Sequence, residues 1–175
     1  MGMRTASDEA RTPKYAHIER ERRWLIEPRL RPDVSRCPYV LVQDRYITGT
    51  RLRLRRMTQS ANGVVAMKLT KKYEADDPLA RPIMTAYLTN EEYRLFEALP
   101  AVTLAKRLYD VADGAFEYSV DIFEGSLEGL ELAEIEWPDD QGLRALAGPF
   151  WAVRDVSEDA RYWGAQLARC GIPEG

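Results

Sequence analysis

The chain lacks the residues that several common functional classes require. It has one histidine, His17, which leaves no second imidazole ligand for a zinc site. Its two cysteines, Cys37 and Cys170, lie far apart and form no CxxC motif, so we expect reduced thiols. No apolar run reaches the length of about 18 to 20 residues that spans a bilayer, and no apolar signal stretch opens the chain. These absences argue against zinc hydrolysis and membrane insertion, and we expect a cytoplasmic protein.

The charge balance also limits the partners that we expect. The formal net charge is only −3, although 30% of the residues are charged and 45% are hydrophobic. This is an ordinary globular composition, and it lacks the basic character of most nucleic-acid-binding domains. We therefore expect no nucleic-acid partner. At 175 residues the chain suits one domain over residues 16–175, after a flexible leader over residues 1–15.

Alternation of apolar and polar residues predicts a protein that is mainly β. We expect strands over residues 17–26, 39–48, 50–57, 64–73, 82–88, 102–111, 115–123 and 127–137. A helix should follow Thr89, because Glu92 completes a capping box. A short helix or turn is expected over 139–148, and a closing helix that begins at Ser157 and ends at Gly171. Eight strands with late helices predict an eight-stranded antiparallel closed β-barrel with flanking helices, since closure removes exposed sheet edges.

Charged residues recur at every second position in several of these strands. One such strand alone is ordinarily a solvated surface. When several strands share the pattern, their charged faces are expected to meet inside the barrel. The basic set would be Arg23, Arg51, Arg53, Arg55, Lys68, Arg81 and Lys106, and the acidic set would be Glu19, Glu21, Asp121, Glu134 and Glu136.

An interior of this kind requires a ligand, because unpaired buried charges are costly. Guanidinium groups match phosphate oxygens, whereas clustered carboxylates are the hard ligands that Mg²⁺ or Mn²⁺ prefers. A small-molecule triphosphate bound with divalent metal would satisfy both sets.

The segment IERERRWLI resembles the ExExK signature of the CYTH or triphosphate tunnel metalloenzyme family. Glu19 and Glu21 match its two glutamates, and Arg23 stands where lysine is usual. The similarity continues through LRLRR, MKLTKK, VDIF, GLELAEIEWP and WxxxxVSEDARY, and it covers roughly residues 17–173. The resemblance implies an eight-stranded antiparallel tunnel. It also implies one of the family's activities, which are inorganic, thiamine or RNA triphosphatase and adenylate cyclase.

The resemblance assigns expected roles to individual residues. The carboxylates would hold metal, and the guanidinium and ammonium groups would hold phosphate; a shift of one residue in the strand register would replace Lys68 by Lys71. The expected metal ligands are Glu19, Glu21, Asp121, Glu134 and Glu136; the expected substrate ligands are Arg53, Arg55, Lys68, Arg81 and Arg107; and the expected catalytic group is Glu19, Glu21, Arg23 and Lys106.

The chain departs from the family pattern at three places. Ile83 and Thr85 stand where alternating glutamates are usual. The usual Lys-x-Arg appears as Lys106-Arg107-Leu108, and the usual Glu-Val-Thr appears as Asp155-Val156-Ser157. These departures bear on the metal site more than on the fold.

The sequence therefore predicts a metal-dependent triphosphate hydrolase that releases phosphate from inorganic triphosphate or from a nucleoside or other organic triphosphate. The alternative is a nucleotide- or polyphosphate-binding module without turnover, which Ile83 and Thr85 favour. Adenylate cyclase is a weaker alternative, because nothing identifies an adenine pocket. Trp151, Tyr162 and Trp163 are expected to pack against the barrel. Whether the chain forms a homodimer stays open.

Overall fold

The computed structural model describes residues 13–174, and within this range nine strands form one antiparallel sheet. The first twelve residues of the expected leader lie outside the described residues. The strands are β1 (His17–Ile26), β2 (Val40–Ile47), β3 (Leu52–Gln59), β4 (Val65–Lys72), β5 (Ala80–Tyr87), β6 (Ala101–Asp113), β7 (Phe116–Phe123), β8 (Glu131–Glu136) and β9 (Ala152–Asp155). All eight expected strands are present, with ends that differ by a few residues.

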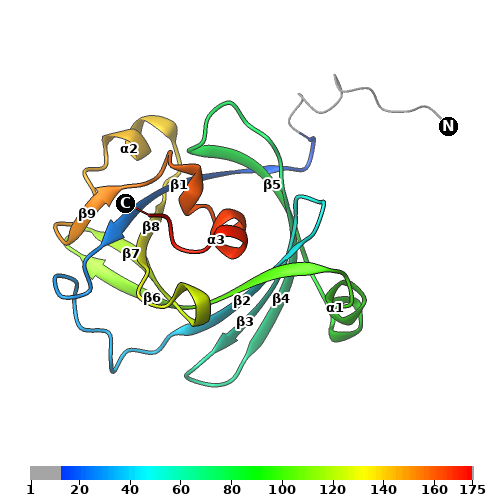
Figure 1. Cartoon of the computed structure of the whole chain (residues 1–175). Helices are drawn as coiled ribbons and strands as arrows, with labels where there is room; N and C mark the ends of the chain where they lie inside the picture. The colour runs from blue at the N-terminus through cyan, green and yellow to red at the C-terminus, as the bar shows by residue number, and fades with distance from the viewer. Residues whose placement is uncertain (1–12, 175) are drawn as a thin grey trace.

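Strand β1 closes the sheet into a barrel. One edge of β1 pairs with β8, and the other edge pairs with β5 along residues 17–20, so that strands β1 to β8 form a ring (Figure 1). The predicted eight-stranded antiparallel closed barrel is confirmed. The sequence did not predict β9, which pairs with β1 along Trp24, Leu25 and Ile26, beyond the point where β5 ends.

The first two helices occupy their predicted places. Helix α1 (Asn90–Glu97) begins after Thr89, whose side chain accepts from the Glu92 amide while the Glu92 carboxylate accepts from the Thr89 amide. The predicted capping box is confirmed. Helix α2 (Asp140–Ala145) is short and is capped by Asp139.

The predicted closing helix is wrong in its first half. After Asp155 the chain forms a 3-10 turn (Ala160–Tyr162), and Trp163 is extended, so helix α3 spans only Gly164–Cys170. Ser157 does not cap a helix, because its hydroxyl accepts from the Arg23 backbone amide at 2.9 Å. This hydrogen bond to β1 holds the segment against the barrel, and a regular helix that began at Ser157 would break the hydrogen bond.

The apolar strand faces point outward, where other segments cover them. Helix α1 covers β3 and β4 and places Tyr93 against Leu54 and Met67. On the opposite side, α2 and the segment that follows it cover β1, with Trp151 fully buried beside Trp24. The charged faces therefore point into the barrel, as the alternation predicts.

Helix α3 closes part of the lumen with apolar side chains. Leu167 packs with Leu104, Phe123 and Leu132, and all four side chains are buried. Figure 1, which looks along the barrel, shows α3 inside the ring of strands. The charged part of the lumen thus ends at an apolar floor. No helix among the described residues is long and apolar enough to cross a membrane.

Two glycines with positive φ provide a test of the packing over β1. A Cβ at Gly148 (φ 82°) would lie 2.5 Å from Trp24 Nε1, whereas a Cβ at Gly129 (φ 95°) would meet no atom within 4 Å. Gly129→Ala should cost about 1 to 2 kcal/mol for the left-handed backbone alone. Gly148→Ala should cost roughly 3 kcal/mol or more, because it adds a clash with a packed indole. Chemical denaturation of both variants measures the difference, and equal losses of stability would contradict this packing.

Candidate functional site in the barrel lumen

The lumen contains a cavity of about 620 Å³ that opens between the charged strand faces. Its walls come from strands β1 to β8, from Trp163 just before helix α3, and from Gly164 and Leu167 of α3. The charged residues that line it are Glu19, Glu21, Arg23, Asp44, Arg51, Arg53, Arg55, Lys72, Glu74, Arg81, Lys106, Glu134, Glu136 and Arg169. Acidic and basic groups that are distant in sequence therefore share one enclosed space.

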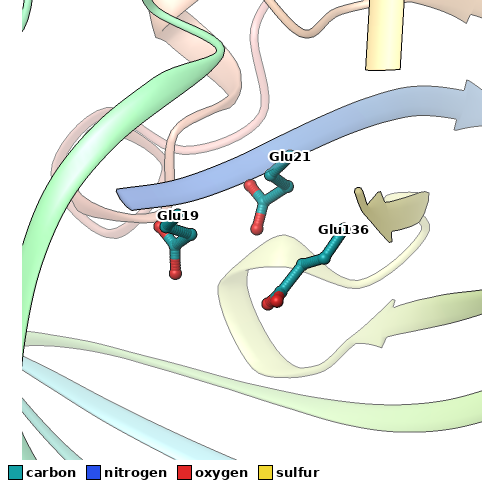
Figure 2. A group of neighbouring side chains, drawn as sticks. All are labelled: Glu19, Glu21 and Glu136. Atoms are coloured by element: carbon teal, nitrogen blue, oxygen red, sulfur yellow. The ribbon is translucent and has the colours of Figure 1, made fainter. Parts of the chain in front are cut away.

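Three of the five predicted metal ligands form a cluster. Glu19, Glu21 and Glu136 each offer an oxygen, and these oxygens lie within 4.8 Å of one another (Figure 2). Glu21 and Glu136 are direct partners across β1 and β8, an arrangement of like charges that is unfavourable without a cation. Burial raises the pKa of Glu136, and the negative charges of Glu19 and Glu21 raise it further. The three carboxylates fit a hard divalent cation.

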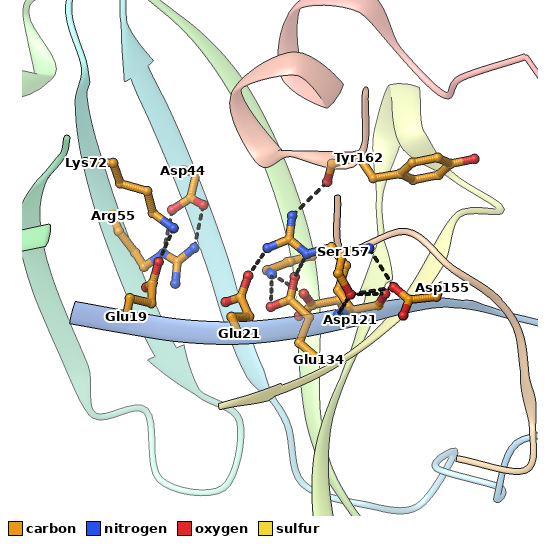
Figure 3. Close-up of polar contacts among 12 residues, drawn as sticks. Glu19, Glu21, Asp44, Arg55, Lys72, Asp121, Glu134, Asp155, Ser157 and Tyr162 are labelled. Carbon is orange, nitrogen blue, oxygen red and sulfur yellow. Dashed lines mark hydrogen bonds and ion pairs between the residues drawn. The ribbon is translucent and has the colours of Figure 1, made fainter. Parts of the chain in front are cut away.

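The other two predicted metal ligands are held by basic side chains. Glu134 lies 3.0 Å from Arg23 Nε, and Asp121 forms an ion pair with Lys106 (Figure 3). Burial opposes the ionisation of Glu134, but Arg23 and Lys106 outweigh it and lower the pKa of Glu134 to about 2. These two carboxylates balance Arg23 and Lys106, and they lie outside the three-glutamate cluster.

The predicted phosphate ligands differ in how they are paired. Arg55 binds Asp44 through two hydrogen bonds of 2.7 Å, which fix the plane of its guanidinium group. Arg53 and Arg81 form no ion pair with any described residue, and the Nε of each is buried without a hydrogen-bond partner. Instead, the Arg81 guanidinium lies 3.4 Å from the centre of the Trp163 ring. Burial, followed by repulsion from Arg23, lowers the pKa of Arg81.

Two predicted substrate ligands do not line the cavity. Arg107 lies on the outer face, where it pairs with Glu124 at 2.7 Å and covers the Tyr39 ring. The structure therefore does not place Arg107 where it could bind phosphate in the cavity. Of Lys106, Arg107 and Leu108, only the first and the third line the cavity. Lys68 shares the strand face of Lys72, but its ammonium lies over the Tyr87 ring, outside the cavity lining.

Sequence reasoning missed four charged residues that line the cavity, which are Asp44, Lys72, Glu74 and Arg169. Lys72, at the end of β4, pairs with Glu19, and Asp44, in the middle of β2, pairs with Arg55. The alternation along each strand could have identified Lys72 and Asp44. Lys72 shares the inner face of β4 with Thr70, and Asp44 shares the inner face of β2 with Val42 and Tyr46. The alternative lysine considered, Lys71, lies on the other face of β4 and its ammonium covers the Tyr73 ring.

The inner face of β5 is neutral where the family pattern has glutamates. Thr85 lies opposite Thr70 on β4, and their hydroxyls are 3.0 Å apart. Ile83 lies opposite Lys72. The acidic residues that line the cavity are therefore confined to β1, β2 and β8, apart from Glu74 in the connection after β4.

The late aromatic residues are mostly structural, as expected. Trp151 and Tyr162 are buried in the two main apolar clusters. Tyr162 and Trp163 both line the cavity, but Trp163 differs because its ring stacks on Arg81. The Tyr162 carbonyl also accepts a hydrogen bond from the Arg23 guanidinium at 3.0 Å, so the segment before α3 helps to position the Arg23 side chain.

Comparison with known proteins finds one related protein by sequence but no family model. No family model matches the chain. An inorganic triphosphatase of Acetivibrio thermocellus is 36% identical over 66 residues, which are 38% of this chain and 41% of that protein. The match thus spans less than half of that curated relative.

Solved structures share the fold over most of the chain. The inorganic triphosphatase NE1496 aligns with a TM-score of 0.57 at 23% identity, covering 90% of this chain and 97% of that one. A putative adenylate cyclase of Bacillus halodurans aligns with a TM-score of 0.51 at 13% identity, covering 74% and 85%. The resemblance seen in the sequence motifs therefore extends to the fold.

The Asp44–Arg55 pair gives a prediction on stability and pH. Burial opposes the ionisation of Asp44, but Arg55 outweighs it and lowers the pKa to about 2 from 3.8. Asp44→Asn should cost about 3 to 5 kcal/mol at neutral pH, because it leaves a buried guanidinium unpaired. Since the folded pKa is depressed, this stabilisation is present above 3.8 and is lost as the pH falls toward about 2.

Chemical denaturation at neutral and acid pH checks both parts of this prediction. Asp110→Asn is the matched control, since Asp110 is exposed on β6. An Asp44→Asn variant as stable as this control, or a stability difference that persists in strong acid, would contradict the role of the pair.

Proposed function

We propose that this chain, which resembles the CYTH or triphosphate tunnel metalloenzyme family in sequence motifs and in fold, is a metal-dependent triphosphate hydrolase. One observation carries the proposal: two guanidinium groups without an ion-pair partner among the described residues share a cavity with three clustered carboxylates. A polyanion bound with a divalent cation supplies partners to both sets.

The basic side chains would bind the phosphate chain. Arg53 and Arg81 line the cavity without an ion-pair partner among the described residues, so their guanidinium groups would bind phosphate oxygens, and Asp44 holds Arg55 in a fixed orientation beside them. Lys106 lines the same cavity and is kept there by Asp121. Preorganised positive charge of this kind stabilises the charge that moves to the leaving phosphate oxygen, so catalysis is mainly positioning and electrostatics.

Glu19, Glu21 and Glu136 would hold the metal, which we propose to be Mg²⁺ or Mn²⁺. When bound, such an ion supplies charge neutralisation and orients water. Glu134 has a different part, since its carboxylate fixes Arg23 and lies 4.0 Å from Lys106.

Inorganic triphosphate is the substrate that we favour, ahead of a nucleoside or other organic triphosphate. The Acetivibrio thermocellus relative and NE1496 are both named inorganic triphosphatases. The apolar floor formed by Leu167 and its neighbours ends the charged space, which suits a short polyanion. The cytoplasmic location and the small-molecule partner expected from the sequence belong to the same proposal.

A binding module without turnover is the second candidate. The neutral Thr70–Thr85 pair supports it, because a wall without carboxylates offers a metal fewer ligands. Adenylate cyclase has weaker support, since the likeness to the putative cyclase of Bacillus halodurans concerns the fold alone.

An assay of phosphate release separates the two candidates. The purified protein is incubated with tripolyphosphate, ATP or thiamine triphosphate, each with Mg²⁺ or Mn²⁺, while thermal stability is measured in parallel. We expect metal-dependent release that is fastest with tripolyphosphate. Thermal stabilisation by these compounds without phosphate release would support the binding module and overturn the hydrolase.

Arg53 provides a matched test of the phosphate side. Arg53→Met should lower kcat/KM for tripolyphosphate by about 100-fold, since it removes a charged donor from the cavity. Arg56→Met is the control, because Arg56 is exposed on the opposite face of β3. Equal activity of the two variants, with circular dichroism confirming their fold, would rule out phosphate binding by the inner face of β3.

A further inference from the structure

Lys72 places a positive charge at the carboxylate cluster. Its ammonium pairs with Glu19, one of the three clustered glutamates (Figure 3). Burial opposes ionisation of Glu19, but Lys72 and then Arg53 outweigh it, and the pKa of Glu19 is lowered. The protein therefore supplies a cation of its own beside the proposed metal ligands.

This ammonium and a divalent cation would compete for Glu19. The two positive charges would share one carboxylate within a few ångströms, where their repulsion is strong in a partly buried site. Glu21 already pairs with Arg23, and Glu136 forms no ion pair with any described residue. A metal at the cluster therefore gains from the departure of Lys72.

The Lys72 side chain is exposed enough to move away from Glu19, and it lines the cavity in which the triphosphate would bind. Its side chain is 30% exposed, compared with 9% for Lys106, which is locked against Asp121. Lys72 lines the same cavity as Arg53 and Arg81, on the strand next to Arg53. A lysine has a long flexible stem, and it binds phosphate as a point charge without a fixed orientation.

We infer that Lys72 is an internal counter-ion that exchanges between Glu19 and the bound triphosphate. Without ligands it neutralises Glu19 and weakens metal binding. When metal binds the glutamates, Lys72 is released to the phosphate chain. Because this transfer favours both ligands together, metal and triphosphate should each strengthen the binding of the other by the same factor. The inference rests on the proposed function, since it assumes the metal and phosphate sites described above.

Metal affinity tests the inference without any turnover. The variants are Lys72→Met, which removes the charge at similar length, Lys72→Arg, which keeps the charge, and Lys71→Met, which removes a charge from the outer face of β4. Mn²⁺ binding is measured from the electron paramagnetic resonance signal of the free ion, with no phosphate present. Lys72→Met should bind Mn²⁺ about tenfold more tightly than the wild type, whereas Lys72→Arg and Lys71→Met should match the wild type.

For tripolyphosphate, we expect Lys72→Met to have the opposite effect on affinity. Tripolyphosphate binding is measured by calorimetry in the presence of a chelator, and Lys72→Met should weaken it by about tenfold, because one phosphate ligand is lost. A residue that only supports the fold would not tighten one ligand and weaken the other. Unchanged or weaker Mn²⁺ binding in Lys72→Met would overturn the inference. If the wild type still releases phosphate with metal, the hydrolase proposal would survive that result.

Discussion

The pairing of β1 with β5 and β8 is the constraint on which the rest of the structure depends. It closes the ring, and by its register it sets Glu19 opposite Arg81, Glu21 opposite Glu136 and Arg23 opposite Glu134. A slip of one residue would turn these charges outward and bring Trp24 into the lumen. The cost of such a slip is high on both faces, because the outer face of β1 is buried under Trp151 and α2. The apolar packing outside the barrel thus fixes the charges inside it.

The charges of the lumen are only partly balanced by the protein. Asp44, Asp121 and Glu134 each hold a basic group in place, and these pairs account for Arg55, Lys106 and Arg23. The remaining charges lie in two separate places. Positive charge lies at Arg53 and Arg81, and an excess of carboxylates lies at the cluster that includes Glu136. Buried ion pairs contribute little net stability, but they hold their members in fixed positions. The lumen accordingly has basic groups that Asp44, Asp121 and Glu134 hold in position, and unpaired groups at Arg53, Arg81 and Glu136 that can bind a ligand.

Local sequence patterns predicted most of the barrel but fewer of the contacts inside it. Alternation located all eight strands of the ring and the inward face of β1, because that signal depends only on the backbone period. It missed β9, whose four residues are ordered by pairing with Trp24 and its neighbours, a contact that no local pattern encodes. The helix expected from Ser157 failed for the same reason, since a hydrogen bond to β1 outweighs helix propensity there. The family motif Lys-x-Arg predicted Arg107 in the site, but the alternation of β6 turns its side chain outward, where it pairs with Glu124. Lys72 was not predicted there, because it stands at the end of its strand.

The stacking of Trp163 on Arg81 has an optical consequence. Of the four tryptophans in the chain, Trp163 is the one that lines the cavity, while Trp24 and Trp151 belong to the core outside the ring and Trp137 packs against it. An anion that draws the Arg81 guanidinium away would uncover the face of this indole and change its surroundings. Ultraviolet emission from the unlabelled protein therefore contains a contribution that follows the filling of the lumen, and Trp163→Phe would separate it from the emission of the other three indoles.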